Sequence, residues 1–373
     1  PNTTCVRQTE QLGTGHAVLQ AEKALKGFTG TVLIVCGDVP LMETQALQAF
    51  LDAHQTQKNV VTAGSAVVDD PTGLGRMLRD KKGKFVGIRE HKDCSNNELA
   101  IREVNVGIYA VSSTQLLPLL KSVTNKNAQK EYYLPDIISL GLKAKLAVAA
   151  VEFEQDPSEL GGINNRVQLA MAEQSLQERY AEYHLLNGAT LQDPATTHFS
   201  WDTQLGQDVT IEPNVYFGAG VKVADNVAIH ANSYLEGCTI ESGASVGPFA
   251  RIRAGTTVGE DAKIGNFVET KKAKIGKGSK VSHLTYVGDV TIGSNVNVGA
   301  GTIVANYHAF RKTKAETHIA DGASIGANSV LVAPVSIGKD AFVAAGTVVR
   351  KDVAAGTLVA DKPEQIVKTN YKK

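Results

Sequence analysis

One histidine in a lysine-rich stretch is the first candidate for catalysis. His283 lies in the segment VSHLTY, five lysines precede it between positions 271 and 280, and Tyr286 and Asn297 follow. A neutral imidazole near physiological pH can take a proton from an attacking amine. Lysine side chains can hold a phosphate by charge. The pattern suggests a general base beside a site for an amino-sugar phosphate. A structural histidine is the commoner explanation for a lone His, and a solvated surface explains the lysines equally well.

A second candidate lies near the N-terminus. Gly37 and Asp38 follow the apolar run 31–36 (TVLIVC), which places a carboxylate at the C-terminal end of a predicted buried strand. Magnesium is usually held by one or two protein carboxylates and completed by substrate phosphates, so Asp38 could suffice. A turn aspartate explains the same two residues equally well. The glycine-rich segment 11–17 (QLGTGHA) opens a predicted helix and suits close approach by a nucleotide.

The elements around Asp38 indicate an α/β layer structure. Short apolar runs alternate with helical patterns in the first half of the chain, as is typical of this class. We expect strands at 31–36, 60–68, 76–79, 84–89, 103–111 and 145–153, with a hairpin turn at 81–83. Helices are predicted at 43–57 and 165–186, the second ending before Gly188 and linking two domains.

The second half of the chain repeats every six residues. From Leu205 to Val348 an aliphatic residue recurs as the first of six, with small residues at the second and fifth positions. This period predicts a parallel β-helix in which three repeats close a coil, giving roughly eight coils. An antiparallel sandwich would instead alternate with period two. The repeat breaks at 270–274, which is one residue short, and at 304–318, an inserted loop; both breaks are basic.

Composition narrows the class of protein. The chain has 373 residues, which favours two domains, and 38 basic residues balance 38 acidic ones. Zero net charge gives no general attraction to nucleic acid or to an acidic membrane. Four dispersed cysteines, without a CxxC spacing, argue against disulfides and structural zinc, and no apolar run could span a bilayer. We therefore expect a cytoplasmic protein that binds neither nucleic acid nor membrane.

Ten motifs, in order along the chain, carry a family resemblance. They include EQLGTGHA (10–17), DPTGLGR (70–76), EVNVGIY (103–109), GGINNR (161–166), GPFARIR (247–253) and GNFVETKKAKIGKGSKVSHLTYVGD (265–289). The chain resembles the bacterial bifunctional enzymes that join N-acetylglucosamine-1-phosphate uridyltransferase to glucosamine-1-phosphate N-acetyltransferase. The resemblance implies a Rossmann-like pyrophosphorylase domain (1–163), a linker helix (164–190) and a left-handed β-helix of hexapeptide repeats (191–373). It further implies a homotrimer that makes UDP-N-acetylglucosamine for peptidoglycan and lipopolysaccharide from small-molecule substrates.

The same resemblance assigns roles to individual residues. In acetyl transfer from acetyl-CoA, His283 would be the base, and the amino-sugar phosphate would be held by Arg253, Lys271, Tyr286 and Asn297. The acetyl-CoA site would be lined by Ala300, Asn306, Tyr307, Ala327, Ala345 and Lys362. In uridyl transfer from UTP, the nucleotide and sugar would contact Gln8, Gly13, Thr14, Gly75, Glu90, Asn105 and Asn164, and Mg²⁺ would bind Asp38 and Asn164. Lys314 matches a basic residue that reaches a neighbouring subunit's site.

Some positions depart from the family's pattern. Ala327 stands where a serine is usual, Lys362 stands where an arginine is usual, and the loop 308–316 lacks the usual Asp-Gly turn. The family's glycine-rich stretch, which supplies Arg and Lys for the triphosphate, does not precede Pro1 in this sequence. We therefore expect the uridyltransferase fold to be incomplete at its N-terminus, with acetyl transfer intact and uridyl transfer weak.

Two other functions fit parts of the pattern. A zinc-dependent β-helix hydratase would need three histidines converging on one metal, whereas His230, His283, His308 and His318 share no register in the repeat. A β-helix could also serve as a non-catalytic binding or regulatory module on a nucleotidyltransferase. Turnover of acetyl-CoA would distinguish an acetyltransferase from such a non-catalytic module.

Overall fold

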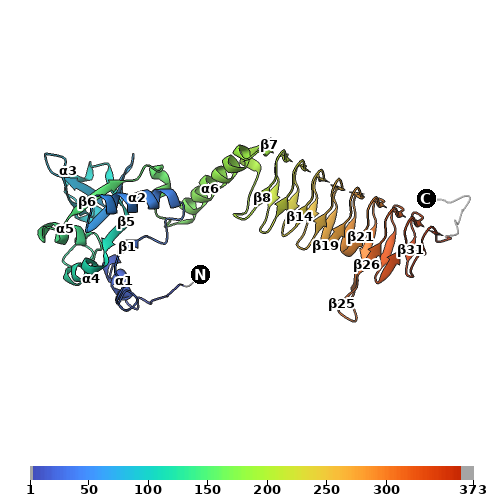
Figure 1. Ribbon diagram of the computed structural model, residues 1–373, viewed down its shortest axis with the longest axis horizontal. Helices are drawn as coiled ribbons and strands as arrows, with labels where there is room; N and C mark the ends of the chain where they lie inside the picture. Colours follow the sequence, from blue (N-terminus) through green and yellow to red (C-terminus); the bar gives the residue numbers. More distant parts are fainter. Residues whose placement is uncertain (1–2, 363–373) are drawn as a thin grey trace, which may run out of the picture. The chain divides into compact units, whose positions relative to one another are not determined.

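The computed structural model describes residues 3–362, and the chain divides into two compact units, residues 1–175 and 176–373 (Figure 1). The division falls inside helix α6 (Arg166–Leu186), which occupies most of the predicted linker. The domain limits at 163 and 191 remain predictions. In the described part of the chain, no helix has the length and apolar character needed to cross a membrane.

A mixed sheet forms the centre of the first unit. Its strands are β1 (Thr31–Ile34), β2 (Val61–Val67), β3 (Arg76–Arg79), β4 (Phe85–Arg89), β5 (Glu103–Ser112) and β6 (Val148–Glu152). The order is β4-β3-β5-β2-β6, with β1 also paired to β5. β2 and β6 are parallel, while the other pairs are antiparallel.

Helices cover both faces of this sheet. Side chains along β5 alternate between the two faces, so β5 contributes to the core on each side. Tyr109 and Val111 join a core with α1 (Thr14–Leu19), α4 (Ser113–Ser122) and α5 (Asp136–Lys143). Ile108 and Ala110 join a second core with α2 (Thr44–Thr56). A short helix, α3 (Asn96–Leu99), follows β4. The α/β layer class predicted from the sequence is therefore confirmed.

The strand expected to be buried at 31–36 is half-buried and shorter. β1 ends at Ile34, and Val35 is 52% exposed. The expectation of full burial was wrong because β1 pairs with β5 alone, and a strand with one neighbour lies at the edge of its sheet.

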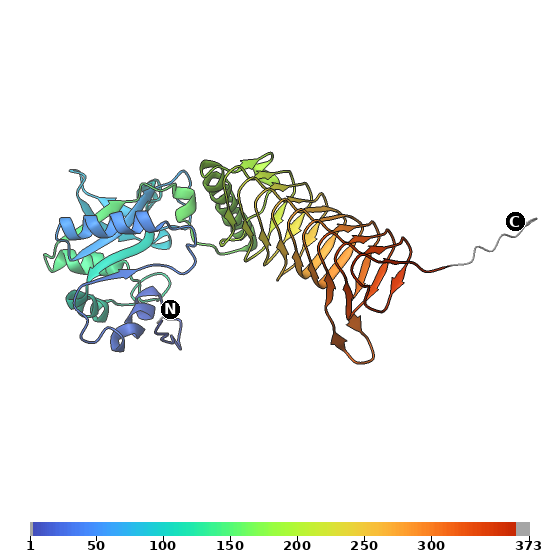
Figure 2. The ribbon, with the colours of Figure 1, turned by 45° about the vertical axis from the view of Figure 1, so that its right-hand side comes forward.

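A parallel β-helix makes up the second unit (Figures 1 and 2). One side is a ten-stranded sheet of β7 (Thr190–Leu191), β9 (Thr210–Ile211), β12 (Ala228–Ile229), β15 (Ser245–Val246), β18 (Lys263–Asn266), β20 (Lys280–His283), β22 (Asn297–Val298), β27 (Ser324–Ile325), β30 (Phe342–Val343) and β32 (Leu358–Val359). Two further sides share a fourteen-stranded sheet of β8 (Gln204–Leu205), β10 (Tyr216–Phe217), β11 (Lys222–Val223), β13 (Tyr234–Leu235), β14 (Thr239–Ile240), β16 (Arg251–Ile252), β17 (Thr257–Val258), β19 (Glu269–Ile275), β21 (Tyr286–Ile292), β23 (Ile303–Ala305), β26 (Thr317–Ile319), β28 (Val330–Val332), β29 (Val335–Ile337) and β31 (Val348–Val349).

The repeat register explains this architecture. The first residue of each repeat points into the shaft, and Ile229, Val246, Ile264 and Val281 stack there with no exposure. Ten strands on one side exceed the roughly eight coils expected. The estimate was low because β7 and β32, the first and last rungs, lie outside the region where the period is visible.

Both breaks in the repeat change the structure locally. At the short repeat, β19 continues around a corner and pairs with β16 through Glu269 and with β17 through Lys274. The inserted segment forms an antiparallel hairpin of β24 (Tyr307–His308) and β25 (Thr313–Lys314), which projects from the coils (Figure 2).

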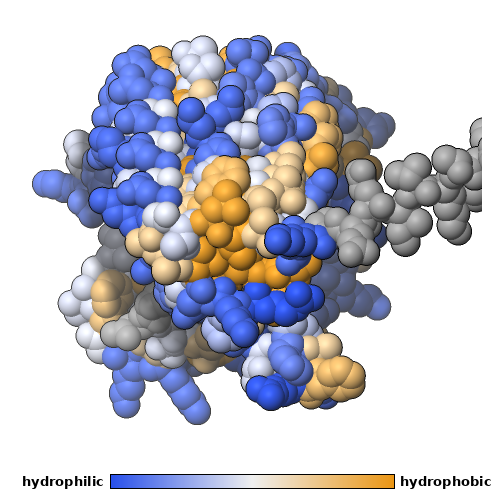
Figure 3. All heavy atoms as spheres, turned by 90° about the vertical axis from the view of Figure 1, so that its right-hand side faces the viewer, coloured by the Kyte–Doolittle hydropathy of each residue, from blue (hydrophilic) through white to orange (hydrophobic). Residues whose placement is uncertain are grey.

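Two apolar features remain on the surface of the β-helix. One corner carries Phe249, Phe267 and Leu284, which are 49%, 54% and 61% exposed and have positive φ angles. The phenylalanine rings stack with centroids 5.2 Å apart. Apolar side chains also gather on the end face around the last coil (Figure 3), where Val348, Val353 and neighbouring residues line a hollow of about 370 Å³.

Candidate active sites

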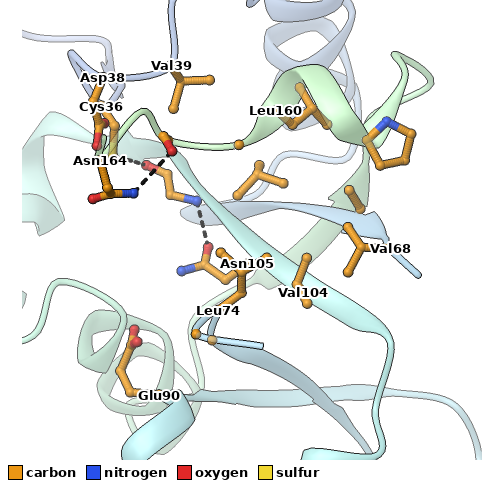
Figure 4. A pocket seen from close by; sticks show the side chains of 18 residues that line it. Cys36, Asp38, Val39, Val68, Leu74, Glu90, Val104, Asn105, Leu160 and Asn164 are labelled. Carbon is orange, nitrogen blue, oxygen red and sulfur yellow. Dashed lines mark hydrogen bonds between the residues drawn. The ribbon is translucent and has the colours of Figure 1, made fainter. Parts of the chain in front are cut away.

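A cavity of about 260 Å³ in the first unit brings together five residues that the resemblance assigned to uridyl transfer (Figure 4). Asp38 follows β1, Gly75 precedes β3, Glu90 follows β4, Asn105 lies on β5, and Asn164 precedes α6. These residues come from loops and strand ends that are far apart in the sequence. The fold therefore gathers the predicted metal and sugar residues around one opening.

Glycines set the close contacts of this cavity. A Cβ added to Gly162 would lie 2.9 Å from Asp38 Oδ2, and the amide of Ile163 donates to the Asp38 carbonyl at 2.9 Å. A Cβ added to Gly75 would lie 3.3 Å from Glu90 Oε1. The site thus depends on glycine at positions where a side chain would press on a carboxylate. Gly162 was not predicted as a site residue, although it lies in the motif GGINNR.

The donor atoms at Asp38 fit a magnesium ion. Asn164 Nδ2 donates to the Gly162 carbonyl at 3.1 Å, so the amide oxygen is the atom that could bind a metal. Within residues 3–362, no three His, Cys, Asp or Glu residues gather closely enough to hold a metal by themselves. One carboxylate and one amide oxygen, completed by phosphate and water, are a donor set that Mg²⁺ accepts.

Burial and like charges shape the electrostatics beside the cavity. Burial, Asp93 and Asp136 raise the pKa of Glu90 above its ordinary value. Burial, followed by the charge of Asp38, raises the pKa of the Cys36 thiol, which makes it a poor nucleophile. The pKa of Asp136 is raised by burial and by Asp93.

Asn105 is held by two hydrogen bonds. Its Nδ2 donates to the hydroxyl of buried Tyr109 at 2.8 Å, and its Oδ1 accepts from the Gly107 amide at 3.1 Å. Tyr109 and Gly107 were not predicted as site residues. Both lie within the motif EVNVGIY (103–109), so the motif could have pointed to them.

Three predicted nucleotide residues do not line this cavity. Gln8 Nε2 donates to the Gly13 carbonyl at 3.2 Å, and Thr14 Oγ1 accepts from the Leu134 amide at 3.0 Å. A Cβ on Gly13, whose φ is 113°, would lie 2.7 Å from the carbonyl oxygen of Tyr132. In this structure the close approach that Gly13 permits is made by the chain's own backbone. Nucleotide contact by Gln8, Gly13 and Thr14 remains a prediction.

His283 ends strand β20 on the surface of the β-helix, as its place in the repeat predicted. Its Nδ1 lies 2.7 Å from Oδ1 of Asn266, one coil away. Backbone bonds then define a column at this corner: Gly301 donates to the His283 carbonyl, Asn328 to that of Ala300, and Gly346 to that of Ala327.

The column therefore runs from His283 through Ala300 and Ala327 to Ala345. Three of the predicted acetyl-CoA residues share this corner on successive coils. Methyl side chains beside an exposed imidazole leave room for a ligand to lie along the coils. Lys362, another of the predicted acetyl-CoA residues, is exposed at the end of the described residues.

The predicted phosphate and sugar residues lie on two sides of the coil. Arg253 follows β16, Lys271 lies on β19 and Tyr286 lies on β21, all on one side, whereas Asn297 lies on β22 beside the strand that carries His283. Arg253 Nη1 contacts Glu269 Oε1 at 2.8 Å.

A half-buried carboxylate ties the inserted hairpin to the coil. Asp289, whose side chain is 12% exposed, accepts from Asn306 Nδ2 at 2.5 Å and lies 3.7 Å from Lys314 Nζ. The Asn306 amide also contacts the Tyr286 hydroxyl at 3.5 Å, while Tyr307 is 54% exposed. Asp289 was not predicted. Lys314, expected to reach a neighbouring subunit, here pairs with Asp289 of its own chain.

Comparisons with known proteins agree with the division of the chain into a first and a second unit. The nucleotidyl transferase profile matches residues 1–175, and the bacterial transferase hexapeptide (six repeats) profile matches 202–237, 237–272 and 316–351. The chain is 50% identical over 367 residues to the bifunctional protein GlmU of Sphingopyxis alaskensis, covering 98% of this chain and 80% of that protein. It is 46% identical over 363 residues to the bifunctional protein GlmU of Zymomonas mobilis, covering 97% and 80%.

Proposed function

This chain belongs to the family of bifunctional GlmU proteins, and from that premise we propose how its residues divide the work between two sites. The chain is an enzyme of UDP-N-acetylglucosamine synthesis. Its left-handed β-helix is the glucosamine-1-phosphate N-acetyltransferase, and its nucleotidyltransferase unit is the N-acetylglucosamine-1-phosphate uridyltransferase.

For acetyl transfer, His283 acts as the general base. Its imidazole takes a proton from the amine of glucosamine 1-phosphate as the nitrogen attacks the acetyl carbonyl. The new C–N bond forms, the C–S bond breaks, and coenzyme A leaves as a thiol after gaining a proton. The observation that carries this proposal is the exposed imidazole at the start of the alanine column.

Other residues of the β-helix hold the substrates in this proposal. Arg253 and Lys271 bind the sugar phosphate by charge, while Tyr286 and Asn297 bind the sugar. The coenzyme lies along Ala300, Ala327 and Ala345, with Asn306, Tyr307 and Lys362 as further contacts. Backbone N–H groups near Ala300 would donate hydrogen bonds to the oxyanion that forms at the acetyl carbonyl.

For uridyl transfer, the sugar phosphate attacks the α-phosphorus of UTP and pyrophosphate leaves. Gly75, Glu90 and Asn105 form the sugar side of the cavity, and Asp38 with Asn164 would hold Mg²⁺. When bound, this ion neutralises charge on the phosphates. Asn105 is oriented in advance by Tyr109 and Gly107, which lowers the cost of holding the sugar in place.

A homotrimer is the proposed assembly. The predicted phosphate residues and His283 lie on different sides of the coil, and the exposed corner of Phe249, Phe267 and Leu284 offers apolar surface for contact between copies. Sedimentation should give a trimer, and a monomer at micromolar concentration would contradict this. We further propose a cytoplasmic location, where the four unpaired cysteines would stay reduced.

The two roles can be tested on one preparation. Release of free thiol from acetyl-CoA reports acetyl transfer, and release of pyrophosphate from UTP reports uridyl transfer. His283→Ala should lower the first by roughly 10² to 10⁴-fold and spare the second. Asp38→Ala should do the reverse. Each variant is thus the control for the other, and near-normal acetyl transfer by His283→Ala would refute the proposed base.

A further inference from the structure

The imidazole of His283 has a defined partner on the neighbouring coil. Asn266 and His283 stand opposite each other in the β18–β20 ladder, and Asn266 Oδ1 lies 2.7 Å from His283 Nδ1. A carbonyl oxygen accepts hydrogen bonds and donates none, so Nδ1 must carry the hydrogen. In the neutral ring this leaves the lone pair on Nε2, the nitrogen that can accept a proton from substrate.

The backbone holds this pair in register. β18 and β20 each have four residues, twice the two-residue length of β15 and β22, the next strands on either side. A Cβ added to Gly265 would overlap the carbonyl of Ser282, so only glycine permits the close approach immediately before the pair. Thr285 Oγ1 donates to the His283 carbonyl at 2.6 Å, which fixes the backbone that follows.

We propose that Asn266 is a positioning residue for acetyl transfer, which holds His283 in the tautomer and orientation that present an unprotonated Nε2. The inference rests on the proposed role of His283 as base. Without Asn266, the ring can rotate and can place its hydrogen on Nε2, where it blocks proton abstraction. Asn266 itself contacts neither the amine nor the acetyl group in this role.

The test compares two substitutions at position 266. Asn266→Ala removes the acceptor and should lower kcat for acetyl transfer by about tenfold, the factor of one net hydrogen bond, with little change in KM. Asn266→Asp keeps an acceptor opposite Nδ1 and should restore most of kcat. Lys263→Ala, an exposed position on the same strand, is the matched control and should leave both constants unchanged.

A direct readout is the nitrogen NMR spectrum of the imidazole. In the full-length protein His283 should show hydrogen on Nδ1, and in Asn266→Ala the population with hydrogen on Nε2 should rise. An unchanged tautomer or an unchanged kcat in Asn266→Ala would overturn the inference. Equal losses in the alanine and aspartate variants would also overturn it, because they would show that the acceptor atom is irrelevant.

Failure of this inference is distinguishable from failure of the proposed function. If His283→Ala is inactive and Asn266→Ala is fully active, Asn266 has no positioning role and His283 keeps its own. If His283→Ala is active, the proposed base is wrong. Should Asn266→Ala fail to fold, thermal unfolding will show it, and strong loss of kcat in a folded Asn266→Asp would then refute the inference.

Discussion

Replacing Gly162 with alanine should impair the predicted magnesium site while leaving the fold intact. The new Cβ would lie 2.9 Å from Asp38 Oδ2 and 3.4 Å from its Cγ. Ordinary van der Waals contacts of a Cβ begin at 3.4 Å, so the carboxylate must move by roughly half an ångström or rotate. Magnesium demands near-ideal octahedral geometry at about 2.0–2.1 Å, so a shift of this size matters.

We expect the Mg²⁺ concentration for half-maximal uridyl transfer to rise roughly 10- to 100-fold, the usual cost of disturbing the groups that orient a metal ligand. The assay is pyrophosphate release over a range of Mg²⁺ concentrations. Acetyl transfer by the same preparation should be unchanged, which shows that the protein is folded.

Gly37→Ala is the matched control, because Gly37 also adjoins Asp38. A Cβ there would meet no atom within 4 Å, and its φ angle is not positive. This variant should keep the parent's magnesium dependence and gain slightly in stability through the unfolded state. If Gly162→Ala and Gly37→Ala behave alike, the close approach of Gly162 does not hold the Asp38 carboxylate in place, and this prediction is refuted.

Three further predictions concern other parts of the chain. Asp289→Ala should raise KM for acetyl-CoA by roughly tenfold, because Asn306 loses its partner; unchanged kinetics would show that the hairpin needs no anchor. Glu90→Gln should raise Tm at neutral pH, since the raised pKa means that ionised Glu90 destabilises the fold as pH rises through that pKa. The gain should vanish in acid, where Glu90 is protonated, and a gain independent of pH would contradict this. Ile264→Ala should lower the free energy of unfolding by about 2–5 kcal/mol, whereas exposed Lys263→Ala should change it by less than about 0.5 kcal/mol, and equal effects in denaturant unfolding would refute the shaft assignment.

The β-helix was predictable because its rule is local. Each repeat must bury its first residue. The six-residue period therefore predicts that Ile264 and Val281 are buried, and both are fully buried in the structure. The exposure of His283 followed from the same register. The number of coils did not follow, because the end strands β7 and β32 are held by their neighbours and carry little of the pattern.

Features that depend on contacts between distant segments could not be predicted. The partnership of Asn266 with His283 depends on how a shortened repeat aligns neighbouring coils. Asp289 meets Lys314 because an inserted hairpin folds back, and no periodicity encodes that. β1 is half-buried because of which strands pair with it, although its own residues are as apolar as those of a central strand.

The alanine column at the corner of the β-helix also acts as a ruler. Neighbouring strands repeat at about 4.8 Å, so the three steps from His283 to Ala345 span roughly 14 Å. The length of a site along this corner therefore changes only in steps of one coil, and small shifts of a loop cannot adjust it. To accept a longer ligand, another complete turn of the solenoid would have to be inserted, while exchange of one column alanine for a bulky residue such as leucine would block the path along the corner at that coil.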